Sequence, residues 1–210
     1  MSNEMGLQEA IYNCRAMRRL DSKEVPEDLL LQLIDAANQA PSGSNAQNGR
    51  WIVVRDPEVK QQLADLNRTA VTAYISPALE ADRSGEQPLQ PKRARMLESV
   101  MWQMEHLHEV PALIIALLKF PPDTDAMSRA RAGGSIWPGV QNLLLTARSL
   151  GLGAAPTTLA LADSSAVAEV LHLPENMSAY CLIPVGYPLG KFGPVTRKPL
   201  SDILRFDRWR

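Results

Sequence analysis

Three short apolar runs typical of buried strands are separated by longer stretches with helical periodicity. The runs cover residues 51–54, 112–118 and 180–185. The strongest helical pattern, residues 136–150, places apolar side chains three and four positions apart and ends at glycines. Because the strands are few and scattered among more numerous helices, the sequence predicts an α+β fold.

Further helices are predicted from the same periodicity and from their start and stop signals. One helix is expected between Pro26 and Pro41, and others at residues 7–19, from 56 onward, at 93–108 and at 163–171. Two Pro-rich segments interrupt this pattern. Residues 76–92 form either a loop or a helical lid with broken ends, and residues 121–130 are expected to form a surface loop.

The charge and cysteine content exclude several classes of protein. The formal net charge of −1 provides no general attraction to nucleic acid. Cys14 and Cys181 are too few for a disulfide framework, and neither they nor the histidines have the spacing of a metal site. No apolar stretch approaches the ~20 residues that span a bilayer, and the N-terminus lacks the pattern of a secretory signal. We expect a cytoplasmic protein with no metal, nucleic-acid partner or membrane span.

The tail from residue 187 to residue 210 is rich in proline, glycine and arginine but also carries large apolar side chains. These are Phe192, Leu200, Ile203, Leu204, Phe206 and Trp209. They must be buried either on the protein's own domain or on a partner chain. No linker or repeat divides the sequence, so we predict one domain over residues 1–210, with residues 187–210 as a C-terminal extension.

Two basic segments could bind phosphate. Arg15, Arg18 and Arg19 cluster at the end of the first predicted helix, and the planar guanidinium group suits bidentate phosphate recognition. The alternative is a solvated helix end, where cations oppose the negative end of the helix dipole. Arg197 and Lys198 form either a second phosphate ligand or a basic surface tail.

Residues 40–47 combine small residues, hydroxyls and two amides at one turn between a helix and a strand. Such a turn brings backbone N–H groups close to a flat polar ring, because Gly43 adds no bulk, but a plain polar connection has the same composition. No dinucleotide-binding, P-loop, nucleophile-elbow or zinc-protease motif occurs. An enzyme of this sequence therefore borrows its chemistry from a cofactor.

Four stretches together resemble the nitroreductase (flavin reductase-like) family. They are residues 10–20, 40–47, 140–153, and 183–188 leading to 197–200. The resemblance implies an α/β sandwich, with a mixed, mostly antiparallel sheet flanked by helices. It also implies an intertwined homodimer in which each C-terminal extension reaches the partner subunit.

The same resemblance implies that the chain binds FMN at the dimer interface. Arg15, Ala16 and Arg18 should then meet the phosphate and ribityl chain, and Arg197 should approach the phosphate from the tail. The residues expected near the ring or ribityl chain, partly from the other subunit, are Pro41, Ser42, Gly43, Asn45, Gln47 and Ser135. The backbone of Thr157, Thr158 and Leu159 should face the flavin N5 edge.

The sequence departs from the family pattern at the same segments. Many members have arginine at the position of Cys14 and serine at that of Ala16, so one phosphate donor is missing here. Many also have Pro-Trp where this chain has Asn48-Gly49, which alters the packing beside the predicted ring site.

The reaction that the resemblance implies is hydride transfer from NAD(P)H to flavin N5, followed by reduction of a small electron-poor acceptor such as a nitroaromatic or a quinone. No catalytic side chain is expected, because the flavin carries the chemistry. The alternatives are reductive dehalogenation or oxygen-dependent flavin cleavage on the same fold, and a flavin-binding protein without turnover.

Overall fold

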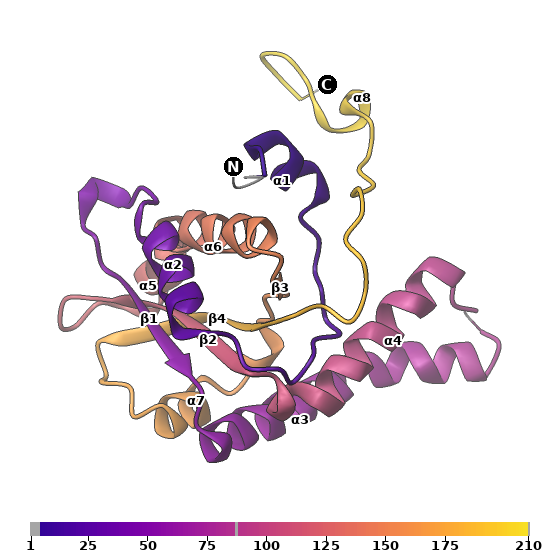
Figure 1. Cartoon of the computed structure of the whole chain (residues 1–210), viewed down its shortest axis with the longest axis horizontal. Helices are drawn as coiled ribbons and strands as arrows, with labels where there is room; N and C mark the ends of the chain where they lie inside the picture. Colours follow the sequence, from indigo (N-terminus) through magenta and orange to yellow (C-terminus); the bar gives the residue numbers. More distant parts are fainter. Residues whose placement is uncertain (1–4, 87, 210) are drawn as a thin grey trace.

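A four-stranded sheet lies at the centre of the computed structural model, which describes residues 5–86 and 88–209 (Figure 1). The strands are β1 (Gly49–Val54), β2 (Ala112–Lys119), β3 (Gly153–Ala154) and β4 (Met177–Gly186), in the order β1-β2-β4-β3. Each neighbouring pair is antiparallel. This agrees with the mostly antiparallel sheet that the family resemblance implies. The strand β3 was not predicted, because its two residues are too few to show the alternation of apolar and polar side chains that indicates a strand.

Helices cover both faces of the sheet. The α-helices are α1 (Leu7–Asn13), α2 (Glu27–Asn38), α3 (Pro57–Arg83), α4 (Pro91–His106), α5 (Ala126–Arg131), α6 (Trp137–Ser149), α7 (Ser164–Val170) and α8 (Leu200–Ile203). Short 3₁₀ turns are η1 (Gly43–Asn45), η2 (Leu107–Glu109), η3 (Ala132–Ser135) and η4 (Leu159–Leu161). No helix in the described ranges is long and apolar enough to cross a membrane.

The strand β2 divides the core into two layers. Alternate side chains, including Ile114 and Ala116, pack with α2 and α6, whereas Ile115 and Leu117 pack with α3, η2 and η4. Because helices cover both faces, seven consecutive residues of β2 are buried. This explains why its sequence is a continuous apolar run and not an alternating one. The prediction of an α+β sandwich is confirmed.

The predicted first helix is too long. It ends at Asn13, and the residues that follow are not helical. The amide of Met17 donates to the Ala154 carbonyl in β3 (3.1 Å), and Leu20 forms a bridge with Pro188. Met17 and Leu20 are also buried in the core. These contacts outweigh helix propensity, so the arginines lie on a non-helical segment rather than at a helix end.

The segment 76–92 is mostly helical. The helix α3 continues through Pro77 to Arg83, and α4 begins at Pro91, so the two form the long hairpin at the right of Figure 1. Val71, Ile75 and Leu97 bury one another between these helices, and this packing holds α3 together despite the proline. Of the two alternatives left open by the sequence, the helical one is confirmed for residues 76–83 and 91–92, and the role of a lid stays a prediction.

The predicted surface loop at 121–130 is also partly wrong. The helix α5 begins at Ala126, and the Asp125 carboxylate caps it by accepting a hydrogen bond from the Ser128 amide (3.0 Å).

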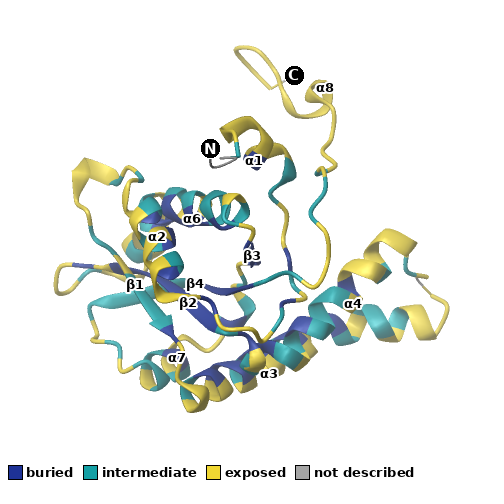
Figure 2. Ribbon diagram, viewed as in Figure 1, coloured by how far each residue is buried: buried dark blue, intermediate teal, exposed yellow. Residues whose placement is uncertain are grey.

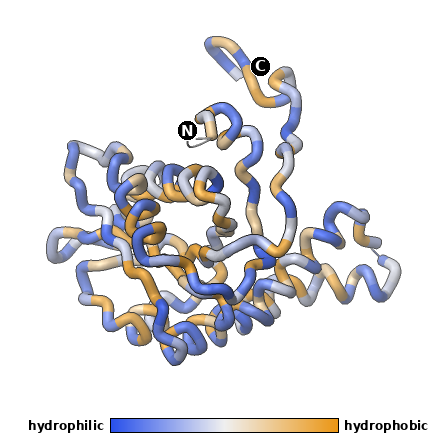
Figure 3. Tube along the Cα trace, in the orientation of Figure 1, coloured by the Kyte–Doolittle hydropathy of each residue, from blue (hydrophilic) through white to orange (hydrophobic). Residues whose placement is uncertain are grey.

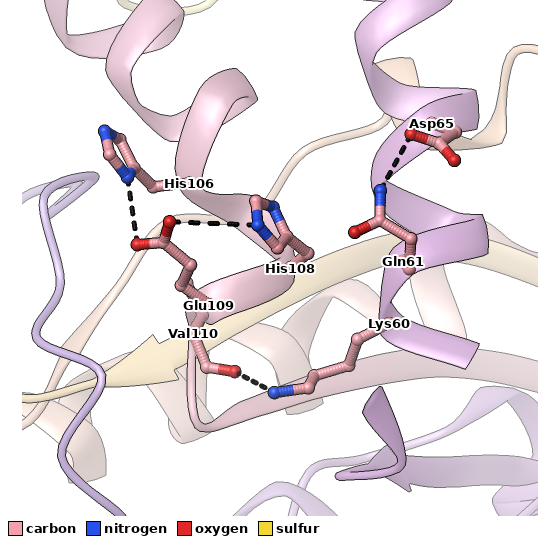
Figure 4. Close-up of polar contacts among 7 residues, drawn as sticks. All are labelled: Lys60, Gln61, Asp65, His106, His108, Glu109 and Val110. Atoms are coloured by element: carbon pink, nitrogen blue, oxygen red, sulfur yellow. Dashed lines mark hydrogen bonds and ion pairs between the residues drawn. The ribbon is translucent and has the colours of Figure 1, made fainter. Parts of the chain in front are cut away.

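The base of α3 is fastened to the connection between α4 and β2 (Figure 4). Lys60 Nζ donates a hydrogen bond of 2.9 Å to the carbonyl oxygen of Val110, and both residues are buried. Nearby, His106 Nδ1 lies 2.9 Å from Glu109 Oε2. The Lys60 contact joins the base of α3 to the segment that leads into β2, and the histidine contact lies within the end of α4 and η2.

The helix α1 and the C-terminal tail lie side by side, away from the sheet (Figure 1). The Val195 amide donates to the Tyr12 carbonyl (3.1 Å), but the outer surface of this unit is exposed (Figure 2). Figure 3 shows hydrophobic stretches along it. The exposed large apolar side chains of this unit include Leu7, Leu200, Phe206 (83% exposed) and Trp209 (72% exposed). The tail therefore buries few of its apolar residues on its own chain.

Candidate functional site

The arginine segment lines a strongly basic cavity of about 720 Å³. Arg15, Arg18 and Arg19 are joined there by Lys92 and Arg95 of α4 and by Lys191 of the tail. None of the ion pairs within residues 5–86 and 88–209 involves these side chains. Burial lowers the pKa of the Arg18 guanidinium, though an arginine stays charged at neutral pH. The cavity is therefore suited to an anionic ligand.

Arg197 joins Arg15 and Ala16 at a second cavity, of about 540 Å³, between α1, α6 and the tail. The sequence predicted that these distant residues serve one ligand, and the fold brings them to one cavity. The wall also contains Arg148, whose guanidinium lies over the ring of Phe192 at 4.2 Å.

Cys14, which stands where many family members have arginine, faces this second cavity. Its thiol donates a weak hydrogen bond to the Leu144 carbonyl (3.6 Å), and burial raises the pKa of the thiol. The residue is therefore a neutral, partly packed side chain at neutral pH and supplies no positive charge to the site.

Arg18 also lines a third cavity, of about 330 Å³, with Thr157, Thr158 and Leu159. The turn at these residues is held by two backbone hydrogen bonds between Thr157 and Leu182 of β4 (2.8 and 3.0 Å). The backbone N–H of Thr158 donates to no acceptor in the described part of the chain. It is available to a ligand in the position that the sequence prediction gave to the flavin edge.

Two buried amides, Asn67 of α3 and Gln103 of α4, line this third cavity and were missed by the sequence analysis. A signal for Asn67 was present. It lies four residues after Leu63 and four before Val71, so it occupies the apolar face of α3. An amide on such a face is a candidate for a specific role.

The remaining predicted residues form a separate group around η1. The Gly43 amide donates to Ser135 Oγ (3.1 Å), and the Gln47 amide donates to Ser42 Oγ (2.9 Å). Gln47 Nε2 also donates to Asn45 Oδ1 (3.2 Å). Asn45 and Gln47 have positive φ angles of 50° and 46°, so the turn is tightly bent. Ser135 therefore contacts the 41–47 turn, and its role at the flavin stays a prediction.

The two groups lie on different sides of the molecule. In Figure 1 the turn between α2 and β1 is at the left, whereas the arginine segment descends from α1 near the middle of the view. None of the three basic or amide-lined cavities described above contains a residue of the 41–47 turn. One chain therefore does not bring all the predicted site residues together.

Comparisons with known proteins agree with these observations. The family model described as Nitroreductase family matches residues 11–187. An iodotyrosine deiodinase of Thermotoga neapolitana is 29% identical over 195 residues, covering 90% of this chain and 91% of the relative. An NADH dehydrogenase of Thermus thermophilus is 29% identical over 201 residues, covering 90% of each chain.

Solved structures show the same fold. An oxidized iodotyrosine deiodinase bound to FMN and 3-iodo-L-tyrosine has a TM-score of 0.75 at 23% identity, covering 97% of this chain and all of the other (100%). The NfrA2 protein of B. megaterium has a TM-score of 0.74 at 20% identity, covering 98% of this chain and 76% of that one. The predicted architecture is thus confirmed by independent structures.

Proposed function

The chain belongs to the nitroreductase family, and on this basis we propose that it is an FMN-dependent oxidoreductase. In this proposal NAD(P)H reduces the cofactor, leaves, and is replaced by a small electron-poor acceptor such as a nitroaromatic or a quinone. The observation that carries the proposal is the gathering of Arg15, Arg18 and Arg197, none of them in an ion pair among the described residues, at adjoining cavities.

The residues present fit FMN. A terminal monophosphate is a dianion that needs several charged donors, and Arg15 and Arg197 share one cavity. Arg15 also lines the basic cavity, and Arg18 lines both the basic cavity and the cavity of Thr157, so these two arginines connect the proposed phosphate end with the proposed ring end. The free N–H of Thr158 supplies a donor for a polar ring edge.

Within this site the protein binds and orients, and bound FMN would supply the hydride chemistry. We assign the phosphate to Arg15 and Arg197 and place Arg18 between the phosphate and the ring. The described residues contain no group of three or more metal-ligating side chains, so we assign no metal ligands.

We further propose a homodimer in which the turn with Pro41, Ser42, Gly43 and Asn45 reaches the partner's cofactor. The separation of the two groups within one chain supports this arrangement. The exposed apolar residues of α1 and the tail also support it. A partner subunit that buried side chains such as Phe206 and Trp209 would remove apolar surface from water, and this would stabilise the dimer. The tail would then act as the extension predicted from the sequence.

The proposal is tested with the purified protein. A yellow protein should release FMN on heating, identified by chromatography, and should oxidise NADH or NADPH when menadione or nitrobenzene is added. Release of FAD, or failure to bind any flavin on reconstitution, would refute the cofactor assignment. Flavin without NAD(P)H oxidation would leave a binding protein without turnover.

Reductive deiodination is the second candidate, because several relatives are named iodotyrosine deiodinase. The hairpin of α3 and α4 beside the third cavity would serve as the lid over a halogenated ring. Incubation with 3-iodotyrosine and a reductant, followed by iodide analysis, separates this candidate from the first.

A further inference from the structure

The basic cavity holds more positive charge than the proposed FMN phosphate requires. That phosphate is assigned to Arg15 and Arg197, which meet at the second cavity. The described residues that line the basic cavity include no aspartate or glutamate. Four of its cations have no role in the FMN assignment and form no ion pair in the described part of the chain: Arg19, Lys92, Arg95 and Lys191.

The grouping of these four cations is a local feature. The whole chain has a formal net charge of −1, so the excess at the cavity does not reflect a generally basic protein. Arg19 comes from the arginine segment, Lys92 and Arg95 from α4, and Lys191 from the tail. Like charges held close together destabilise the folded chain through repulsion. An anionic ligand that contacts all three parts of the chain would relieve this repulsion.

The basic cavity adjoins the proposed ring site. Arg18 and Met96 line both the basic cavity and the cavity of Thr157. The volume of the basic cavity, about 720 Å³, lies in the range of cavities that hold a small organic molecule. A ligand that reacts at the flavin ring would therefore place an anionic end, remote from its reacting group, among the four cations.

We propose that these cations bind the 2′-phosphate of NADPH, so that the protein selects NADPH over NADH. A phosphate monoester carries nearly two negative charges at neutral pH, and NADH lacks this group. The planar guanidinium group of Arg95 suits a bidentate contact with phosphate, and Lys92 and Lys191 supply point charges. The hydroxyls of Ser99 and Thr196 line the same cavity and add hydrogen-bond donors.

This inference rests on the proposed function for the role of a nicotinamide dinucleotide as co-substrate. It goes beyond that function by choosing between the two dinucleotides. The pyrophosphate is common to both and supplies no discrimination, so the difference between their affinities reports on the 2′-phosphate alone.

The first test is calorimetric titration of the flavin-loaded protein with NADP⁺ and NAD⁺, the oxidised forms, which bind without turnover. We expect NADP⁺ to bind at least about tenfold more tightly, as charge-assisted contacts to one phosphate group predict. The preference should shrink as salt is added, because salt screens exposed charges. Equal affinities, or tighter binding of NAD⁺, would overturn the proposal.

The variants Lys92→Gln and Arg95→Gln remove one charge each. Both side chains are exposed, so each variant should weaken NADP⁺ binding only about fivefold, and the double variant about twentyfold. Affinity for NAD⁺ should stay within about twofold. Arg93→Gln is the matched control, because it removes the same charge from an exposed position of α4 that does not line the cavity. A parallel loss for both dinucleotides would assign the cations to the shared pyrophosphate and refute the proposal.

Two further titrations separate the 2′-phosphate from the FMN phosphate. Lys191→Gln tests the same cavity from the tail and should also weaken NADP⁺ selectively. The dissociation constant of the apo-protein for FMN should stay within about twofold in Lys92→Gln and Arg95→Gln. A tenfold loss of FMN affinity in either variant would place these cations on the cofactor and overturn the inference.

Adenosine 2′,5′-bisphosphate and adenosine 5′-monophosphate differ only in the 2′-phosphate and contain no nicotinamide. The bisphosphate should bind more tightly to the purified protein, and Lys92→Gln and Arg95→Gln should reduce its advantage. This result from a protein that oxidises neither NADH nor NADPH would refute the proposed function and not the phosphate site. A protein that oxidises both dinucleotides equally well and binds both nucleotides equally would support the proposed function and refute this inference.

Discussion

Gly153 lies so close to Met17 that a Cβ on the glycine would stand 2.8 Å from the Cβ of Met17. The same added atom would lie 2.8 Å from Leu20 Cδ2. Met17 and Leu20 flank Arg18, so the missing side chain at position 153 lets the arginine segment rest directly on β3.

We predict that Gly153→Ala lowers the free energy of unfolding by about 1–3 kcal/mol, the usual effect of overpacking a close contact. Urea denaturation measures the change. Gly134→Ala is the control, because no heavy atom lies within 4 Å of its added Cβ. Because the contact involves the arginine segment, Gly153→Ala should also weaken FMN binding. Equal stability of both variants would show that β3 and the segment move apart freely.

Lys60→Met should lower the free energy of unfolding by about 1–3 kcal/mol at neutral pH, since it leaves the buried Val110 carbonyl without its donor. Lys92→Met, at an exposed position of α4, should have little effect. Chemical denaturation of the two variants tests the difference. Equal losses would mean that the contact contributes no stability.

The same lysine predicts a pH dependence. Burial lowers the pKa of Lys60 below its ordinary value of 10.5, and the charge of Asp56 opposes this shift in part. Between the pKa of Lys60 in the folded protein and 10.5, the unfolded chain binds more protons than the folded chain. The contribution of Lys60 to the free energy of unfolding therefore increases with pH in this window. The advantage of the wild type over Lys60→Met should therefore grow as pH rises into this window, measured by denaturation at pH values from neutral to about 10. A shrinking advantage would show that the lysine is better stabilised when charged.

Arg18→Ala should weaken FMN binding by about one to two orders of magnitude, as expected when a charge-assisted contact is lost. Cys14 is uncharged and supplies no replacement. Fluorescence titration of the apo-protein with FMN gives the dissociation constant, and excess FMN should restore much of the turnover. Arg18→Lys should rescue only part of the affinity, because it loses the planar fork. The control is Arg83→Ala, at an exposed position outside the cavities described above, which should leave the dissociation constant for FMN unchanged. An unchanged dissociation constant for Arg18→Ala would mean that the proposed site is misplaced.

A chain ending at Lys198 should be a folded monomer with weakened flavin binding. It keeps Phe192, which packs on its own core, and Arg197, but it lacks the exposed apolar residues beyond them. Light scattering after gel filtration measures the mass, and circular dichroism checks the fold. The double variant Phe206→Ser/Trp209→Ser tests the same surface without truncation. A shortened chain that remains a dimer with full FMN affinity would refute the role of the tail.

The central elements were predictable because their patterns are local. The continuous apolar run of β2 and the periodicity of α6 can be read directly from the sequence, and both elements are present. The end of α1 could not be read, since it depends on the pairing of Met17 with β3, far along the chain. The continuation of α3 through Pro77 likewise depends on packing against Leu97 of α4.

The candidate site shows the same division. The basic character of Arg15, Arg18 and Arg197 was visible in the sequence, and the fold gathers them at adjoining cavities. Their roles in binding FMN stay predictions. The amides were overlooked because Asn67 and Gln103 become neighbours of one cavity only when α3 and α4 fold back on each other.

The pairing of the two ends of the chain has a consequence for the order of events during synthesis. The Asp21 amide donates to the Tyr187 carbonyl, and the Leu189 amide donates to the Arg19 carbonyl, so the arginine segment is fastened by residues that are synthesised much later. The strands β1 and β2 can pair while the chain is still growing, but contacts over such a sequence separation must wait for residues 187–189. The arginine segment is synthesised before Arg197, the other proposed phosphate ligand. It is nevertheless among the last parts to reach its final conformation. A chain stalled just after β4 would have its core strands but would lack the contacts that fasten the arginine segment.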